Sequence, residues 1–127
     1  MKSLIILFII FSFYELKAQT SNSFVRFSGS VINNTAKELT IFNYKNYKKV
    51  FLLGENGNFS DTLKIERGYY TLKCGNEISK IFLAPGYDIK MFLDINKFDE
   101  SIQYNGIGSA INNNLAKVYL YNEKKKP

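Results

Sequence analysis

Short apolar or alternating runs, separated by turn residues at intervals of about eight to twelve positions, constrain the fold of this chain most strongly. The runs are rich in Tyr, Phe, Ile, Val and Thr, the residues that half-buried strands prefer. They cover Phe24–Val31, Leu39–Tyr44, Lys48–Gly54, Phe59–Ile65, Tyr69–Cys74, Ile78–Ala84, Ile89–Ile95 and Lys97–Gly106. This rhythm predicts a mainly β protein, an antiparallel β-sandwich of about seven or eight short strands.

Two dipeptides between the runs have clear turn chemistry. Asn56-Gly57 offers positive φ for a hairpin turn, and Pro85-Gly86 fits the two central positions of a type II turn. With 46% hydrophobic and 16% aromatic residues, the chain is also too apolar for disorder. We expect one β-sandwich domain over residues 19–108.

The last segment, residues 109–127, has a different period. Ser109 is a good helix cap, and a helix over Ala110–Tyr121 would carry an apolar stripe. The stripe consists of Ile111, Leu115, Val118 and Tyr119. Asn112, Asn113 and Asn114 are weak helix formers, so this C-terminal helix needs packing to persist. We predict that the stripe is an interaction surface, which docks on the sandwich or on a partner.

The first residues have the features of a secretory signal peptide. Lys2 precedes an apolar run, Leu4–Tyr14, about half as long as the ~20 residues of a membrane span. Ala18 suits cleavage, which predicts a signal peptide over residues 1–18, although Leu16 stands where a smaller residue is commoner. The alternative is an uncleaved membrane anchor. We expect export to the periplasm or the medium, with no membrane span after cleavage.

Charge and residue usage disfavour several classes of function. Lys124, Lys125 and Lys126 supply three of the six net positive charges, so the body lacks a basic face for nucleic acid. The chain has no histidine, the usual general base and the commonest zinc ligand. Its single cysteine, Cys74, forms no CxxC pair and is expected to pack as a small core residue. These features predict no enzyme activity, no cofactor and no metal.

Three motifs have both a chemical and a structural interpretation. "GIGSA" is a GxG motif without the third glycine of a nucleotide-binding loop, and we interpret it as a turn and a helix cap. "DINKFDE" resembles a calcium loop, but Phe98 stands where a ligand is needed, which favours a solvated connection. "NYKNYKK" places aromatics beside cations, a pattern that holds sugars or that protects a hairpin edge. A possible ligand platform consists of Tyr44, Tyr47, Tyr69 and Tyr87.

The order of the motifs resembles that of a known family. "FSGSV", "ENGNFSDTLKIERGYYTLK", "IFLAPGYDIKMFLD" and "SIQYNGIGSAINNNLAKV" are similar to the N-terminal β-domain, of unknown function, of secreted TlpA-like thiol:disulfide oxidoreductases. The matching positions are Gly29, Gly57, Phe59, Gly68, Tyr70, Leu72, Pro85, Gly86, Asp88, Gly106, Gly108, Ser109, Asn113 and Leu115. Tyr87 adds one residue to the tightest form of the family's turn. The resemblance covers nearly all of the chain after the signal peptide.

The resemblance leads to a functional expectation. In that family a thioredoxin-like domain with the catalytic cysteines follows the helix, and Cys74 does not match those cysteines. We therefore expect a non-catalytic, exported accessory domain, truncated before the redox domain, whose partner is another protein or its own missing thioredoxin-like domain. The alternative is a stand-alone secreted module that binds carbohydrate or peptide.

Overall fold

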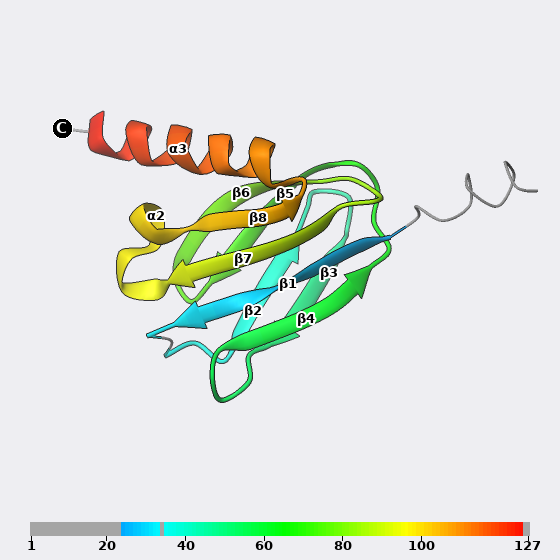
Figure 1. The fold of residues 1–127 in the computed structure, drawn as a ribbon, viewed down its shortest axis with the longest axis horizontal. Coiled ribbons are helices and arrows are strands. Elements are labelled where there is room, and N and C mark those ends of the chain that lie inside the picture. The colour runs from blue at the N-terminus through cyan, green and yellow to red at the C-terminus, as the bar shows by residue number, and fades with distance from the viewer. Residues whose placement is uncertain (1–23, 34, 126–127) are drawn as a thin grey trace, which may run out of the picture.

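Eight strands form in a computed structural model, which describes residues 24–33 and 35–125. Each lies in one of the predicted runs or overlaps it, but the first half of the run Lys97–Gly106 is helical. In chain order these are β1 (Val25–Ile32), β2 (Glu38–Phe42), β3 (Lys48–Leu52), β4 (Asn58–Leu63), β5 (Gly68–Cys74), β6 (Glu77–Leu83), β7 (Asp88–Asp94) and β8 (Gln103–Ile107). A 3-10 helix, η1 (Ile95–Lys97), and a short helix, α2 (Phe98–Ser101), connect β7 to β8, and α3 (Ser109–Lys125) follows β8 (Figure 1). The prediction of a mainly β protein with a C-terminal helix is confirmed. The predicted signal peptide lies outside the described residues.

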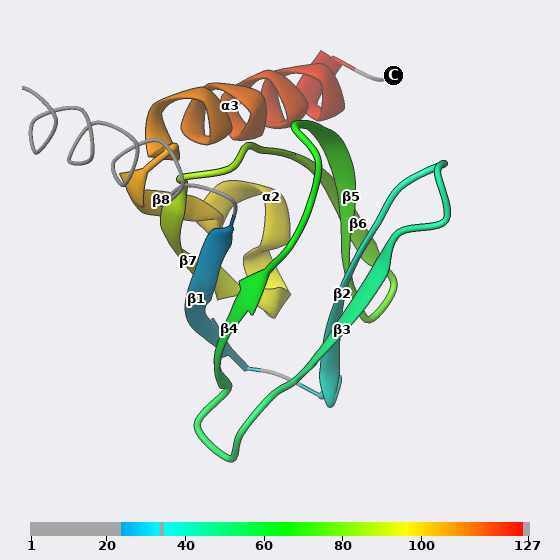
Figure 2. The same ribbon diagram turned by 90° about the vertical axis from the view of Figure 1, so that its right-hand side faces the viewer.

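The strands form two four-stranded sheets, with the orders β4-β1-β7-β8 and β3-β2-β5-β6. The sheets face each other in Figure 2, and side chains from both build one hydrophobic core. The prediction of a purely antiparallel arrangement is wrong at one pair, because β1 and β7 are parallel. Parallel neighbours need a long connection. The chain between β1 and β7, which builds the whole second sheet, supplies it.

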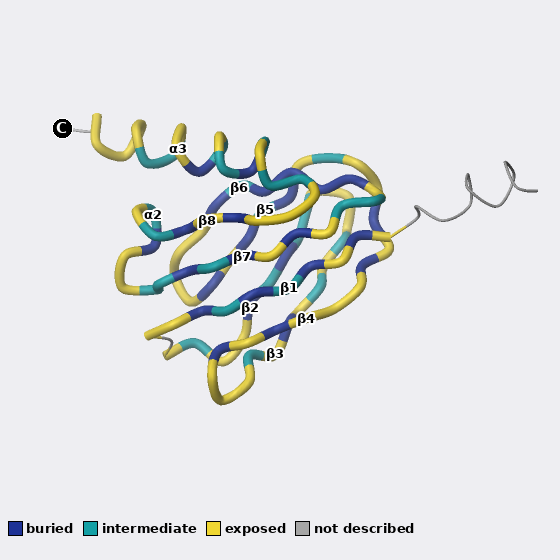
Figure 3. The backbone as a smooth tube through the Cα atoms, viewed as in Figure 1, coloured by how far each residue is buried: buried dark blue, intermediate teal, exposed yellow. Residues whose placement is uncertain are grey.

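Buried residues alternate with more exposed ones along the strands, as the period of two predicts (Figure 3). In β1, Val25, Phe27 and Val31 are buried. The ring of Phe27 lies 5.6 Å from that of Phe51 on β3 and 5.1 Å from that of Phe59 on β4. Each such edge-to-face pair adds about 0.5–1.5 kcal/mol to the free energy gained by burial. These rings therefore hold the two sheets together.

An ion pair lies where the edge strands β3 and β4 meet. Lys49 and Asp61 have the inward parity of Phe51 and Phe59, and the ammonium lies 2.7 Å from the carboxylate. The hydrogen bond from Lys49, followed by that from the Thr62 N–H, holds the pKa of Asp61 below its usual range. Charged side chains that point inward also protect an edge strand from pairing with other chains. This role explains the one break in the apolar alternation of β4.

The helix α3 closes the opposite side, where it lies against the edge strands β6 and β8 (Figures 1 and 2). The Asn112 amide accepts a hydrogen bond from the Phe82 N–H at 2.7 Å and donates to the Phe82 and Gly108 carbonyls, both at 2.9 Å. Asn113 makes the same pair of bonds with the Tyr104 backbone of β8, at 2.8 and 2.9 Å. Each amide takes the place of a neighbouring strand.

These contacts make α3 part of the same structural unit as the strands. Asn112 is 1% exposed and, with Ala116, forms the buried face of the helix. Two of the three asparagines that weaken the intrinsic helix propensity, Asn112 and Asn113, are therefore the residues that dock the helix. Their hydrogen bonds supply the packing that the sequence analysis requires of this segment.

The predicted turn at Pro85-Gly86 is confirmed. Asn56-Gly57 also forms a turn with positive φ, but the predicted hairpin is wrong, because β3 and β4 belong to different sheets and do not pair. Gly57 has φ of 74°, and an added Cβ would lie 1.9 Å from the carbonyl oxygen of Val31. Gly86 has φ of 94°, and the next N–H, of Tyr87, donates to the Ala84 carbonyl at 3.1 Å. Positive φ of this kind favours glycine because it has no Cβ.

Candidate functional site

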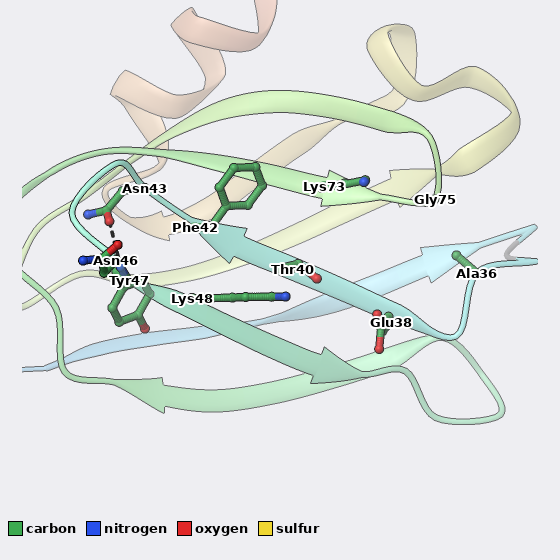
Figure 4. Close-up of a pocket in the computed structure, with 10 residues that line it drawn as sticks. All are labelled: Ala36, Glu38, Thr40, Phe42, Asn43, Asn46, Tyr47, Lys48, Lys73 and Gly75. Atoms are coloured by element: carbon green, nitrogen blue, oxygen red, sulfur yellow. Dashed lines mark hydrogen bonds between the residues drawn. The ribbon is translucent and has the colours of Figure 1, made fainter.

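A groove runs over the middle of the outer face of the sheet β3-β2-β5-β6 (Figure 4). Its volume is about 660 Å³. The strand register places Lys48 of β3 opposite Phe42 of β2, and Lys73 of β5 opposite Thr40 of β2. Side chains that are directly opposite on one face are neighbours, so these four line the groove together. The remaining lining residues are Ala36, Glu38, Asn43, Asn46, Tyr47 and Gly75.

Hydrogen bonds within the β2–β3 turn fix one end of this groove. The Asn43 side-chain oxygen accepts from the N–H groups of Lys45 and Tyr47, both at 3.0 Å. The Asn43 N–H donates to the Tyr47 carbonyl at 3.1 Å, and Asn46 adopts a left-handed φ of 66°. The turn is therefore held in shape by its own polar groups.

An aromatic cluster lies on the same sheet, around Phe82 of β6. The Tyr69 ring lies 5.0 Å from the Phe82 ring, and the Tyr87 ring lies 6.2 Å from it. The guanidinium of Arg67 stands 5.3 Å above the same ring. Phe82 is 8% exposed, and these three side chains lie against its ring.

Tyr44 extends this cluster from the β2–β3 turn. Its ring is 96% exposed, and the Lys80 ammonium lies 5.6 Å from the ring centroid. Lys80 also donates to the Thr71 hydroxyl at 3.0 Å. Tyr44 and Tyr69 line a small pocket of about 220 Å³ together with Arg67. Exposed aromatic rings and cations thus lie together at this end of the sheet.

The structure brings three of the four predicted platform tyrosines together. Tyr44 and Tyr69 share the small pocket, and Tyr69 and Tyr87 contact Phe82. Tyr47 lies apart, half-buried, with its ring 5.5 Å from that of Tyr70. Burial raises the pKa of Tyr47, with smaller contributions from Tyr70 and Asp61.

Phe42, Lys73, Lys80 and Phe82 also belong to this surface, although none of them is among the site residues predicted from the sequence. Each has the outward parity of its own strand, which is visible in the sequence. Their neighbourhood depends on which strands pair and in which register, and single-strand alternation does not contain that information.

The predicted helix stripe has a mixed outcome. Ile111, Leu115 and Tyr119 are half-buried, whereas Val118 is 55% exposed. The face of the helix that contacts the sheets is centred on Asn112, because the Asn112 amide binds the Phe82 backbone of β6. Asn112 and Ala116, rather than the stripe residues, are the buried residues of the helix. The stripe as an interaction surface stays a prediction.

The motif "DINKFDE" forms the capped connection between β7 and β8. The Asp94 carboxylate accepts from the Asn96 N–H and from the Asn33 amide, both at 3.0 Å. The Ser101 hydroxyl accepts from the Asp94 N–H at 2.8 Å. Within residues 24–33 and 35–125 the structure contains no group of His, Cys, Asp and Glu side chains suited to a metal ion.

Two further polar groups lie in the core. Cys74 is buried, its Sγ lies 3.9 Å from the Glu38 carbonyl oxygen, and burial raises the pKa of the thiol. Burial also raises the pKa of Tyr104, whose hydroxyl has no hydrogen-bond partner among the described residues. Both groups are inaccessible to a ligand on the surface.

Comparison of the chain with protein-family models, with curated proteins and with solved structures gives no match. The resemblance to the TlpA-like N-terminal domain therefore stays a prediction. In the described part of the chain, no helix is long and apolar enough to span a membrane.

Proposed function

We propose that the chain is an exported, non-catalytic β-sandwich domain that functions by binding a partner on the outer face of the sheet β3-β2-β5-β6. One observation carries this proposal. Tyr44 and Tyr69, which are 96% and 59% exposed, line a pocket beside Arg67 on this face. Among the described elements, no helix covers the face (Figure 2).

The side chains of this surface suit recognition. A tyrosine offers a large, rigid and amphipathic contact at a low cost in conformational entropy. Arg67 and Lys80 stand over aromatic rings, where cation–π contacts hold them without neutralising their charge. A partner that buries the rings therefore also meets oriented cations.

The non-catalytic part of the proposal is supported by residue usage. The chain has no histidine, and its one cysteine is a buried thiol whose pKa is raised. A buried thiol with a raised pKa is mostly protonated at neutral pH and is a poor nucleophile. We propose that the domain needs no cofactor and no metal.

The binding proposal is tested with purified protein on immobilised libraries of glycans and peptides. A ligand of this face is expected to lose at least tenfold in affinity when Tyr44→Ala and Tyr69→Ala are combined. Tyr121→Ala is the matched control, because Tyr121 is 58% exposed on α3 and lies outside the sheet. A ligand that the double variant binds as tightly as the parent protein would place its site outside the pocket of Tyr44 and Tyr69. The proposal fails if the affinity is also unchanged by substitution of Lys48 and Lys73, which line the groove on the same face.

Export is tested by the intact mass of the protein recovered from its own cells. A mass that matches a chain beginning at or near Gln19 supports the predicted cleavage. A mass that retains residues 1–18 supports the uncleaved anchor instead.

The family resemblance motivates a second candidate, in which the chain contacts a thioredoxin-like domain through α3. The exposed side chains of Val118 (55%) and Tyr121 (58%) favour this helix as the contact surface. Val118→Asp is expected to abolish binding to a separately purified thioredoxin-like domain of the family. Asn114→Asp, an exposed change on the same helix, is the control.

A further inference from the structure

We propose that the groove over β2 binds an acidic oligosaccharide, a sugar chain whose carboxylates come from uronic acid units. This inference deepens the proposed function and rests on it, because it assigns a ligand class to the same face. It is carried by four side chains from three neighbouring strands, Thr40, Phe42, Lys48 and Lys73.

The two lysines give the groove its charge. Lys48 and Lys73 project from β3 and β5, on either side of β2 (Figure 4). Neither forms an ion pair within the described residues, and Glu38 is the one carboxylate in the lining. The spacing of strands and residues puts the two lysine Cα atoms about 12 Å apart. That separation suits charges on different units of a chain better than a single small anion.

The groups between the lysines suit sugar rings. Phe42 provides an apolar surface for stacking, while the Thr40 hydroxyl and the Asn46 amide exchange hydrogen bonds with sugar hydroxyls. The internal hydrogen bonds of the Asn43–Tyr47 turn hold that end of the groove in place before a ligand arrives. A wall fixed in advance lowers the entropic cost of binding.

The position of the groove disfavours an extended peptide. Peptides that bind sheets usually add a strand at a free edge, where backbone groups are unpaired. The strand β2 is paired on both sides, with β3 and with β5, so its backbone is already satisfied. The ligand must therefore be recognised by side chains on the face of the sheet.

The test compares four probes with purified protein by isothermal titration calorimetry. They are a hexamer of galacturonic acid, its neutral methyl ester, a hexaglutamate peptide and a hexamer of deoxythymidylate. We expect the acidic hexamer to bind at least tenfold more tightly than the other three. The affinity for the acidic hexamer is expected to fall at least tenfold in a variant that combines Lys48→Gln with Lys73→Gln. The control combines Lys90→Gln with Lys97→Gln, two exposed lysines outside the groove, and should bind the hexamer as the parent protein does.

Three results would overturn the inference. Binding of the methyl ester as tight as that of the acidic hexamer would show that the protein does not recognise the carboxylates. Equal binding of the peptide or the nucleotide would show a general affinity for polyanions. Acid-hexamer binding that ignores the Lys48 and Lys73 changes but needs Tyr44 and Tyr69 would move the site to the aromatic cluster and leave the proposed function intact. Absence of binding by the acidic hexamer would also overturn the inference. If in addition the libraries yield no ligand that depends on Tyr44 and Tyr69, both proposals fail.

Discussion

Replacing Asn112 by alanine tests how the helix α3 is attached to the two sheets. The side chain is 1% exposed and makes three hydrogen bonds, two with the Phe82 backbone and one with the Gly108 carbonyl. Asn112→Ala removes all three and leaves the outward N–H and C=O of Phe82 without this partner. We expect a large loss of stability without a change of fold.

The magnitude follows from opposing contributions. Three hydrogen bonds of about 1 kcal/mol each give a loss of about 3 kcal/mol. Alanine is a better helix former than asparagine by about 0.7 kcal/mol, which offsets part of that loss. The free energy of unfolding should therefore fall by roughly 2–3 kcal/mol, and the melting temperature by about 10 °C or more.

The assay is urea unfolding followed by circular dichroism, with Asn114→Ala as the control. Asn114 is exposed on the same helix, so its replacement changes helix propensity but no described docking bond. We expect this control to keep or slightly raise stability. Equal effects of the two changes on the unfolding midpoint would refute the idea that the Asn112 amide docks α3.

Asn112→Asp adds a dependence on pH. A carboxylate still accepts from the Phe82 N–H, but it faces the Phe82 and Gly108 carbonyl oxygens without a proton to donate. Burial should raise the pKa of the introduced carboxyl above its unfolded value of about 3.9. The folded state then binds more protons than the unfolded state, so stability falls as pH rises through the folded pKa. The stability deficit of this variant relative to the parent protein should be smallest near pH 4 and larger at pH 7.

Three further predictions concern buried and paired groups. Tyr104→Phe removes a hydroxyl that is buried without a hydrogen-bond partner among the described residues. The free energy of unfolding, measured by chemical denaturation, should be unchanged or raised by about 1 kcal/mol. A loss above about 1 kcal/mol would contradict this. Cys74 should react with a thiol reagent at least a hundredfold more slowly in the folded than in the urea-unfolded protein, and equal rates would contradict its burial. Lys49→Gln should raise the pKa of Asp61 toward its ordinary value, which an NMR titration would measure. The lowered pKa of Asp61 stabilises the folded state above the unfolded-state pKa, and this contribution is lost as the pH falls through the folded-state pKa. The variant lacks this contribution, so acidification should reduce its stability less than that of the parent protein.

The local features of the fold are readable in the sequence. The alternation of apolar and polar residues in β1 agrees with the burial of Phe27 and Val31, and glycine chemistry predicted turns at Gly57 and Gly86. These features depend on a few consecutive residues. The helix start at Ser109 is local in the same sense, since it follows from a capping residue after a glycine.

The prediction failed where partners are distant in the chain. The parallel pairing of β1 with β7 joins Arg26 with Asp88, and no pattern within either strand specifies it. The position of Tyr47 depends on distant residues in the same way, because its ring packs against that of Tyr70 and lies apart from the other three platform tyrosines.

What the sequence determines by itself is therefore which residues face inward, where the chain turns and where the last helix begins. Tertiary structure decides which strands are neighbours, and with them the groove between Lys48 and Lys73 and the docking of Asn112 on Phe82. The physical reason is the range of the interactions. Alternation and turns arise from backbone geometry over two to four residues, whereas strand order and side-chain amide docking arise from hydrogen bonds between segments that meet only when the core is assembled.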